Sequence, residues 1–332
     1  MLTRIGEGLV TAFSRLSYLM IETNSSCNLA CLSCNRSLLA KKGWRSFKNL
    51  SSDEWLKTLS LFKDCPLEII KVEGLSEPML HPQFDSLMKL LRELFPKAFV
   101  IIATNLQYSF EQSPFLKTLP YVDMVYLSID GIEDTYELLR PPAKWSVAKD
   151  WLESSLKKID LCDRKNKLHL NFTATKNNVD QLPRIYELKE NYQLSSVRIN
   201  LAQNWNGHEI NQNTFDDDFI KKLLPYKKDV KGVAGWSFKD CFWPYEGMVV
   251  DVFGNVRQCV INTSQTPLGN IWQDDVAEVF NKNINYLDTR KKLSSDSPGI
   301  GCENCDYKFL AKDLESLLGG KFIQNFPRKF KR

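Results

Sequence analysis

Short apolar, β-branched runs alternate with segments of helical periodicity over the first two thirds of the sequence. The apolar runs predict strands at 17–22, 68–73, 99–104, 124–129, 168–173 and 196–201. Apolar residues at helical spacing predict helices at 53–62, 83–95, 146–159 and 178–192. Strands that alternate with helices form right-handed βαβ units around a parallel sheet. The pattern therefore predicts an α/β fold, a partial (β/α)6 TIM-like barrel, whose chemistry lies at the carboxyl ends of its strands.

This alternation stops near residue 205. Two short apolar runs farther along, at 248–253 and 256–260, flank Gly254-Asn255 and predict a hairpin with those two residues as its turn. We divide the chain at these changes of pattern into an N-terminal helical extension, the barrel, a linker, a small C-terminal α+β domain and a basic tail, at 1–16, 17–205, 206–236, 237–315 and 316–332.

Charge and hydropathy exclude several classes of partner. The chain carries 44 Lys and Arg against 40 Asp and Glu, a net charge of +4, which does not favour nucleic acid. No run approaches the roughly 18 consecutive apolar residues of a membrane span, and the N-terminus lacks a secretory cleavage signal. We therefore expect a cytoplasmic protein without a membrane partner. Because thiols stay reduced in that compartment, we interpret clusters among the nine cysteines as metal ligands or redox groups.

Three cysteines, Cys27, Cys31 and Cys34, follow the first predicted strand within eight residues. A loop of the form CxxxCxxC presents three thiolates to three irons of a 4Fe–4S cluster. The fourth iron then lacks a protein ligand and is open to a substrate or cofactor. A zinc loop with one missing ligand is the structural alternative.

Polar motifs also follow the next three predicted strands. They are Gly74-Leu75-Ser76-Glu77-Pro78, Thr104-Asn105 and Ser128-Ile129-Asp130-Gly131. Together with the cysteine loop, with Arg140 and with Asn171, these motifs make residues 17–205 resemble the radical S-adenosylmethionine (SAM) superfamily.

The resemblance implies that SAM chelates the open iron through its amino and carboxylate groups. It implies six cofactor-binding residues: Glu77, Asn105, Ser128, Asp130, Arg140 and Asn171. Glu77 would accept the SAM ammonium, and Arg140 suits the carboxylate because a guanidinium is a planar fork of donors. Two positions depart from the superfamily pattern, since Ser33 replaces an aromatic residue and Ser76 replaces a glycine.

The chemistry implied by the resemblance begins with one electron from the reduced cluster. Reductive cleavage of SAM gives methionine and a 5′-deoxyadenosyl radical, which abstracts a hydrogen atom from the substrate. A one-electron reductant such as flavodoxin or ferredoxin is therefore an expected partner. The sequence assigns no catalytic side chain, because the cofactor carries the difficult chemistry and the protein positions it.

A second set of cysteines lies in the predicted C-terminal domain: Cys241, Cys259, Cys302 and Cys305. The set resembles the Twitch form of the SPASM extension of radical SAM enzymes, because a full SPASM extension has further cysteines. The resemblance implies an auxiliary 4Fe–4S cluster, fully ligated by protein, that accepts an electron from the substrate radical. A four-cysteine zinc site has the same ligand count, and a purely structural cluster is the other alternative.

The expected enzyme is a radical SAM oxidoreductase that functionalises a C–H bond. Its expected substrate is a ribosomally synthesised peptide, modified by crosslinking, excision or oxidation. The sequence shows no added peptide-binding domain, so a separate leader-peptide-binding protein is an expected partner. The alternatives are dehydrogenation of a small amino-cyclitol or sugar hydroxyl and, in a different class, a non-catalytic metal-stabilised binding protein. Trp205 and His208, after the sixth predicted strand, are candidate substrate contacts.

Overall fold

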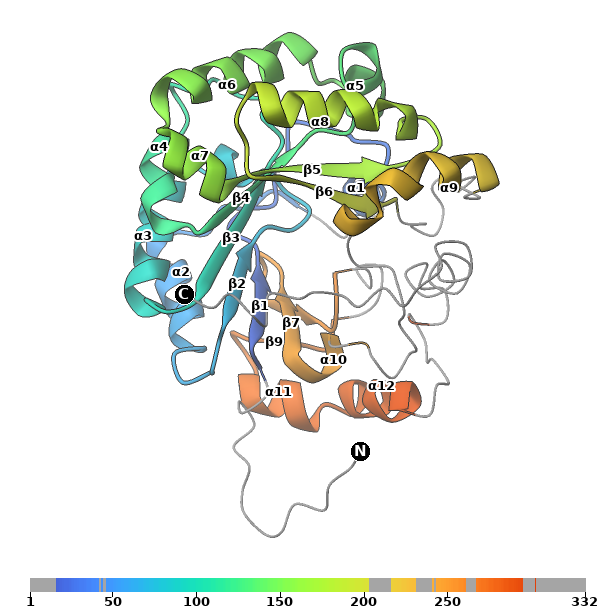
Figure 1. Cartoon of the computed structure of the whole chain (residues 1–332). Coiled ribbons are helices and arrows are strands. Elements are labelled where there is room, and N and C mark those ends of the chain that lie inside the picture. Colours follow the sequence, from blue (N-terminus) through green and yellow to red (C-terminus); the bar gives the residue numbers. More distant parts are fainter. Residues whose placement is uncertain are drawn as a thin grey trace.

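One nine-stranded sheet organises the described part of the chain, in the order β6-β5-β4-β3-β2-β1-β7-β8-β9 (Figure 1). The computed structural model describes residues 16–41, 43, 46–202, 216–230, 241, 243–260, 267–294 and 302. Trp205, His208 and Cys305 lie outside these residues, as do most of the predicted N-terminal extension and the whole basic tail. The strands are β1 (Tyr18–Ile21), β2 (Ile69–Val72), β3 (Phe99–Thr104), β4 (Met124–Ser128), β5 (Leu168–Ala174), β6 (Ser196–Leu201), β7 (Gly247–Val250), β8 (Asn255–Arg257) and β9 (Gly269–Asn270).

The first six strands pair in parallel and in consecutive order, from β1 in the interior of the sheet to β6 at its edge. All six strands predicted from the sequence are confirmed to within one residue at each end. The predicted fold class, an α/β partial barrel, is therefore confirmed. Parallel pairing places the carboxyl ends of these strands along one edge, where the polar motifs of the sequence follow them.

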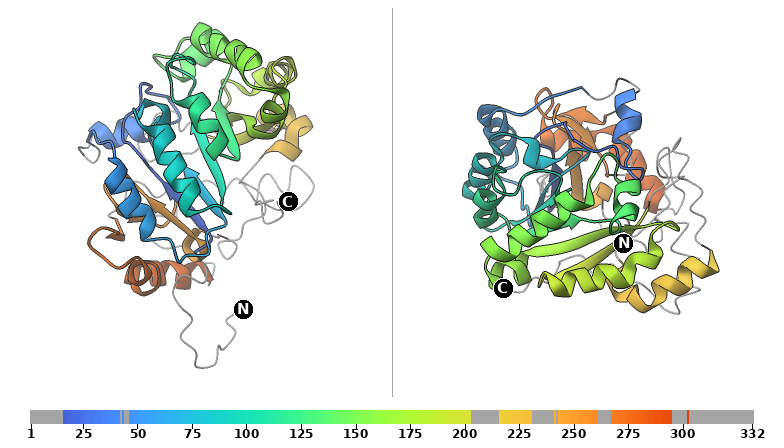
Figure 2. Two further views of the ribbon diagram at one scale, coloured as in Figure 1. Left: turned by 90° about the vertical axis from the view of Figure 1, so that its left-hand side faces the viewer. Right: turned by 90° about the horizontal axis from the view of Figure 1, so that it is seen from above.

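Helices cover the outer face of the curved sheet (Figures 1 and 2). This outer layer includes α2 (Ser52–Ser60), α3 (Phe84–Leu94), α4 (Phe115–Thr118), α6 (Trp145–Lys158), α7 (Leu161–Lys167) and α8 (Leu182–Asn191). The other described α-helices are α1 (Arg36–Lys41), α5 (Asp134–Leu139), α9 (Asp217–Leu223), α10 (Trp243–Glu246), α11 (Val276–Lys282) and α12 (Ile284–Ser294). The four predicted barrel helices are confirmed as α2, α3, α6 and α8. No helix in the described ranges is both long and apolar enough to cross a membrane.

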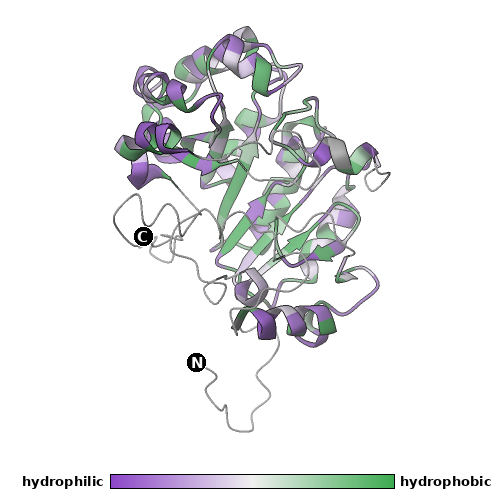
Figure 3. Cartoon of the chain, turned by 90° about the vertical axis from the view of Figure 1, so that its right-hand side faces the viewer, coloured by the Kyte–Doolittle hydropathy of each residue, from purple (hydrophilic) through white to green (hydrophobic). Residues whose placement is uncertain are grey.

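The core lies between the sheet and these helices. Leu19 and Ile21 of β1 and Val72 of β2 are fully buried there, and each such side chain contributes roughly 1.5–3 kcal/mol of hydrophobic stabilisation. The Trp55 indole of α2 is also fully buried and donates to the Leu87 carbonyl of α3 at 2.8 Å. Figure 3 shows the result as apolar strands beneath helices of mixed hydropathy. The packed core thus supports the strand ends that carry the polar motifs.

The C-terminal region continues the same sheet, because β7 pairs in parallel with β1 on the side opposite β2. β8 and β9 then add antiparallel strands. The predicted hairpin is confirmed, but its predicted turn is wrong in part. Asn255 begins β8, and the turn is formed by residues 251–254 with Gly254 at φ +79°. A second contact ties the region to the barrel, since the Trp272 indole donates to the Thr58 hydroxyl of α2 at 3.0 Å.

Candidate functional site

The first three cysteines lie on the loop that leaves β1 and leads to α1. Two backbone hydrogen bonds hold this loop against the end of α5: the Ala30 N–H donates to the Pro141 carbonyl at 2.7 Å, and the Leu32 N–H donates to the Leu139 carbonyl at 2.9 Å. All three cysteines are half-buried. The sequence positions them on one loop, and the structure fixes that loop above the carboxyl ends of the strands.

Each of the three sulfur atoms faces a nitrogen donor. The side-chain amide of Asn105 is 3.7 Å from the Cys27 sulfur, and the Arg140 guanidinium is 4.0 Å from the Cys31 sulfur. The third donor is the backbone N–H that follows Cys34 by two residues, at 3.4 Å. Donors in this arrangement stabilise sulfur in its anionic form, which is the form that binds metal.

The chemistry of this donor set fits an iron–sulfur cluster. Burial raises the pKa of the Cys27 thiol, and burial raises the pKa of the Cys31 thiol to about 12, so ionisation of these groups requires a compensating positive charge. Three thiols on one short loop, each with a nitrogen donor beside it, are a donor set that suits three irons of a 4Fe–4S cluster.

Glu77 lies beside this loop and is 2% exposed. One of its carboxylate oxygens accepts from the Thr104 hydroxyl at 2.8 Å and from the Met79 N–H at 3.1 Å, and the other accepts from the Asn105 N–H at 2.7 Å. Burial raises the pKa of Glu77 to about 7, while these donors lower it. A buried carboxylate held by three donors is a fixed acceptor for a cationic group.

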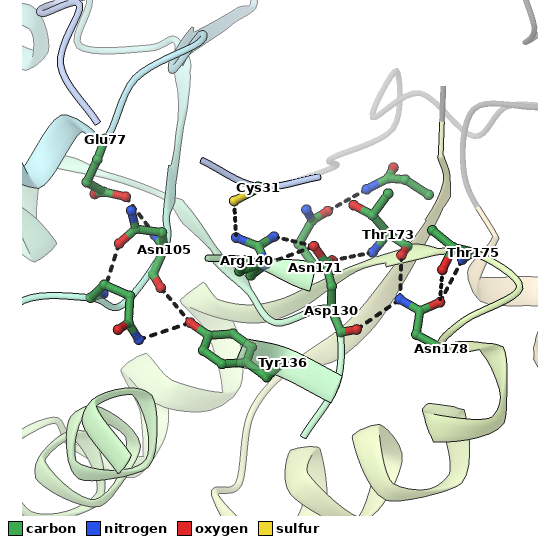
Figure 4. A network of polar contacts seen from close by, with 12 residues as sticks. Cys31, Glu77, Asn105, Asp130, Tyr136, Arg140, Asn171, Thr173, Thr175 and Asn178 are labelled. Atoms are coloured by element: carbon green, nitrogen blue, oxygen red, sulfur yellow. Dashed lines mark hydrogen bonds and ion pairs between the residues drawn. The ribbon is translucent and has the colours of Figure 1, made fainter. Parts of the chain in front are cut away.

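Asp130 and Arg140 form a buried ion pair, with Arg140 donating to one Asp130 oxygen from Nε at 2.8 Å and from Nη2 at 2.7 Å (Figure 4). The other Asp130 oxygen accepts from the Thr173 N–H at 2.6 Å. Asn178 adds a hydrogen bond to the Asp130 carbonyl at 2.9 Å. Because Arg140 also faces Cys31, this network connects the cysteine loop to the ends of β4 and β5.

Ser128 and Asn171 are opposite one another in the register of β4 and β5. The Asn171 side-chain oxygen accepts from the Asn200 amide of β6 at 2.7 Å. Five of the six predicted cofactor-binding residues therefore lie at the carboxyl ends of β2 to β4 or in the segments that follow them. The sixth, Asn171, lies in the middle of β5, opposite the last residue of β4. Their roles toward SAM remain a prediction.

Sequence reasoning missed several residues of this network. The Tyr136 hydroxyl of α5 donates to the Asn105 carbonyl at 3.0 Å and accepts from the Gln107 amide at 3.1 Å. The Asn28 side chain accepts from the Asn105 amide at 2.8 Å. No sequence pattern marks Tyr136 or Gln107. Asn28 could have been found from its place inside the cysteine loop.

Three of the four C-terminal cysteines lie in the described residues, namely Cys241, Cys259 and Cys302, and all three are half-buried. Cys259 follows β8 by two residues. The Gln258 amide is 3.5 Å from the Cys302 sulfur, and its oxygen accepts from the Thr289 hydroxyl of α12 at 2.9 Å. Gln258 is thus a donor toward the second cysteine set that sequence reasoning did not identify.

This C-terminal region resembles a known family of domains. The profile of the SPASM iron-sulfur cluster-binding domain matches residues 241–306. The tungsten-containing aldehyde ferredoxin oxidoreductase cofactor-modifying protein of Pyrococcus furiosus is 33% identical over 120 residues, which cover 35% of this chain and 31% of that protein. The antilisterial bacteriocin subtilosin biosynthesis protein AlbA of Bacillus subtilis is 21% identical over 271 residues, 78% of this chain. The chain spans 58% of the length of AlbA.

Solved structures share the fold over most of the chain. Streptococcus suis SuiB bound to precursor peptide SuiA has a TM-score of 0.66 at 18% identity, over 90% of this chain and 71% of that one. Native anSMEcpe with bound AdoMet and Cp18Cys peptide has a TM-score of 0.60 at 17% identity, over 95% and 91%. BtrN in complex with AdoMet and 2-DOIA has a TM-score of 0.51 at 15% identity, over 85% and 88%. These likenesses establish the fold.

Proposed function

We propose that this chain is a radical SAM protein with a C-terminal SPASM domain. In this proposal it cleaves SAM reductively and uses the resulting radical to modify a peptide. One observation carries this proposal. Three half-buried thiols, each facing a nitrogen donor, lie beside Glu77 and the Asp130–Arg140 pair at the carboxyl ends of parallel strands. That edge is where a barrel of this type binds its substrates.

Different residues of this chain would hold the cluster and SAM. Cys27, Cys31 and Cys34 would hold a 4Fe–4S cluster through three of its irons and leave the fourth for SAM. Glu77 would accept the SAM ammonium, since its carboxylate is fixed by three donors, and Arg140 would bind the SAM carboxylate or orient its neighbours. When bound, the reduced cluster supplies the electron that breaks the carbon–sulfur bond of SAM.

The C-terminal cysteines would hold an auxiliary 4Fe–4S cluster, with Cys305 as fourth ligand beside the three that the structure describes. Such a cluster has no open iron, and its proposed role is to accept an electron from the substrate radical that remains after hydrogen abstraction. A one-electron reductant such as flavodoxin or ferredoxin would supply the first cluster. The reduced thiols that both sites require favour the cytoplasm as the compartment.

A peptide is the substrate that the comparisons favour. SuiB is seen with precursor peptide SuiA, anSMEcpe with Cp18Cys peptide, and AlbA is named for bacteriocin biosynthesis. We propose by analogy that this chain crosslinks, excises or oxidises a ribosomally synthesised peptide, with a separate protein binding the leader. The second candidate, dehydrogenation of an amino-cyclitol or sugar hydroxyl, is favoured by the likeness to BtrN in complex with AdoMet and 2-DOIA.

The proposal is tested by anaerobic reconstitution with iron and sulfide, followed by dithionite and SAM. Formation of 5′-deoxyadenosine is expected, and it should disappear when Cys27, Cys31 and Cys34 are changed together to Ala. Iron near roughly eight atoms per chain is expected from two clusters of four irons. A reconstituted protein that binds SAM but yields no 5′-deoxyadenosine with any strong reductant would contradict the proposal and favour a non-catalytic binding protein. Roughly four irons with one zinc would contradict the auxiliary cluster.

A further inference from the structure

Glu22 lies directly after β1, the strand between β2 and β7, and is 4% exposed. Its side chain reaches both neighbouring strands. The Leu75 N–H, after β2, donates to one carboxylate oxygen at 2.7 Å, and the Val252 N–H, after β7, donates to the other at 3.2 Å. One buried carboxylate therefore joins the ends of three strands.

The packing around this carboxylate explains why residue 74 is a glycine. A Cβ atom added at Gly74 would lie 2.1 Å from Oε1 of Glu22 and 2.3 Å from its Cγ, whereas real Cβ atoms essentially never approach another atom within 3.0 Å. The missing side chain at position 74 thus provides the space through which Glu22 reaches the Leu75 N–H. Glu22 and Gly74 are a matched pair.

The segment held by Glu22 is the one that presents Glu77. Its other end is held from the same loop after β1, because the Asn24 amide donates to the Glu77 carbonyl at 3.0 Å and the Glu77 N–H donates to the Ser26 carbonyl at 2.8 Å. Residues 74–77 are therefore fixed at both ends by the residues that follow β1. A shift of Glu22 would be transmitted directly to the Glu77 carboxylate.

The opposite contact of Glu22 belongs to the C-terminal region. Val252 lies in the turn between β7 and β8, inside the range that matches the SPASM profile. Asp251, beside it, accepts from the Phe253 N–H at 2.9 Å and from the Asn255 N–H at 3.0 Å, so the turn is itself well ordered. Glu22 thus connects a structured element of the SPASM region to the segment that carries Glu77.

We propose that Glu22 is a positioning residue that sets the Glu77 carboxylate for SAM by tying residues 74–77 to the β7–β8 turn. SAM affinity then depends on the docking of the C-terminal hairpin against β1. This inference rests on the proposed function, since it takes SAM as the ligand of Glu77. Glu22 acts on the site through its hydrogen bonds to the Leu75 and Val252 N–H groups, so its role is one of positioning.

The test compares Glu22→Ala and Glu22→Gln with Asp123→Asn in the reconstituted, full-length protein. Asp123 is a matched control, because its carboxylate also accepts a backbone N–H, that of Val100 at 2.8 Å, but at the opposite ends of the strands. Two quantities are measured: amide hydrogen exchange in peptides that contain Leu75 or Val252, and the dissociation constant of SAM. Glu22→Ala should speed exchange at both amides and raise the SAM dissociation constant about tenfold, as expected for losing hydrogen bonds to a charged acceptor.

Glu22→Gln should have an intermediate effect, because the side-chain amide keeps one acceptor oxygen but has an NH2 donor where the carboxylate has its second oxygen. Asp123→Asn should leave the exchange of both amides and the SAM dissociation constant unchanged. Gly74→Ala, which forces Cβ against Glu22, should weaken SAM binding as Glu22→Ala does. In the double variant Glu22→Ala/Gly74→Ala the space is restored, so the two effects should be less than additive.

Two results would overturn the proposal: unchanged exchange at Leu75 and Val252 in Glu22→Ala, or faster exchange at both amides with SAM affinity equal to that of the wild type. An additive double variant would also contradict it. The failure of the proposed function has a different signature. If the wild type does not bind SAM, the exchange measurements still decide whether Glu22 joins the two segments.

Discussion

Replacing Arg140 by Met tests the buried ion pair at the centre of the site. Asp130 and Arg140 are only 2% and 7% exposed. Arg140→Met keeps the aliphatic stem but removes both hydrogen bonds to Asp130, at 2.8 and 2.7 Å. The Asp130 carboxylate then stays buried with the Thr173 N–H as its partner. Removing one member of a buried ion pair lowers the free energy of unfolding by about 3–5 kcal/mol. Because Asp130 keeps its hydrogen bond from the Thr173 N–H, we expect a loss near the lower end, about 3 kcal/mol.

The assay is urea unfolding of the cluster-free protein at neutral pH, for the wild type, Arg140→Met, Asp130→Asn and the double variant. The double variant leaves no unpaired buried charge. Its loss in the free energy of unfolding should therefore be at least ~1 kcal/mol smaller than the sum of the losses in the two single variants. Lys282→Met, at the exposed pair with Glu278, is the control and should unfold like the wild type. A loss below about 1 kcal/mol in Arg140→Met, or additivity in the cycle, would refute the reasoning.

Three further predictions concern single contacts. Glu77→Gln should raise the SAM dissociation constant by roughly 10–100-fold, the value of a hydrogen bond to a charged group, as measured by equilibrium dialysis; an unchanged constant would contradict its role. Burial lowers the pKa of His169 to about 4, below its value in the unfolded chain. The unfolded state therefore binds more protons, and the wild type should lose about 3 kcal/mol more than His169→Gln between pH 7 and pH 4, by denaturant titration. Trp272→Phe should lower the free energy of unfolding by about 1 kcal/mol, because the Thr58 hydroxyl loses its indole donor. Thermal unfolding of Trp272→Phe, Thr58→Val and the double variant checks this contact, and the effects of the two substitutions should not add.

The strands could be predicted because their apolar runs are short, β-branched and bounded by polar residues, as in Phe99–Thr104. The helices that escaped prediction lack such a pattern. α12 (Ile284–Ser294) is largely polar and buries mainly Tyr286 and Leu293, so its sequence has no apolar stripe at helical spacing. α7 (Leu161–Lys167) is short, contains four charged residues among its seven and buries Arg164 rather than an apolar stripe. Its N-cap, Asp160, accepts from the Asp163 N–H at 2.9 Å.

The sequence suggests candidate ligands for the site, but it does not reveal the residues that support them. Cysteines and short polar motifs after strands are visible in a sequence because their spacing is local. Tyr136 and Gln258 act through contacts with residues about thirty positions away, which no local pattern records. The sequence predicts only that Glu22 ends a strand, whereas its hydrogen bond to Val252, 230 positions away, follows from the pairing of β1 with β7.

The strand order explains why one short stretch governs the whole site. β1 lies between β2 and β7, so the chain that leaves its carboxyl end passes the segment with Glu77 on one side and the C-terminal hairpin on the other. The next residues of the same stretch form the cysteine loop, which is fastened to the end of α5 and faces Arg140. Because a folded interior resists deformation, a displacement of the hairpin reaches the Glu77 segment through Glu22. The two cysteine sets, far apart in sequence, are thus linked through residues 22–34 at the end of one central strand.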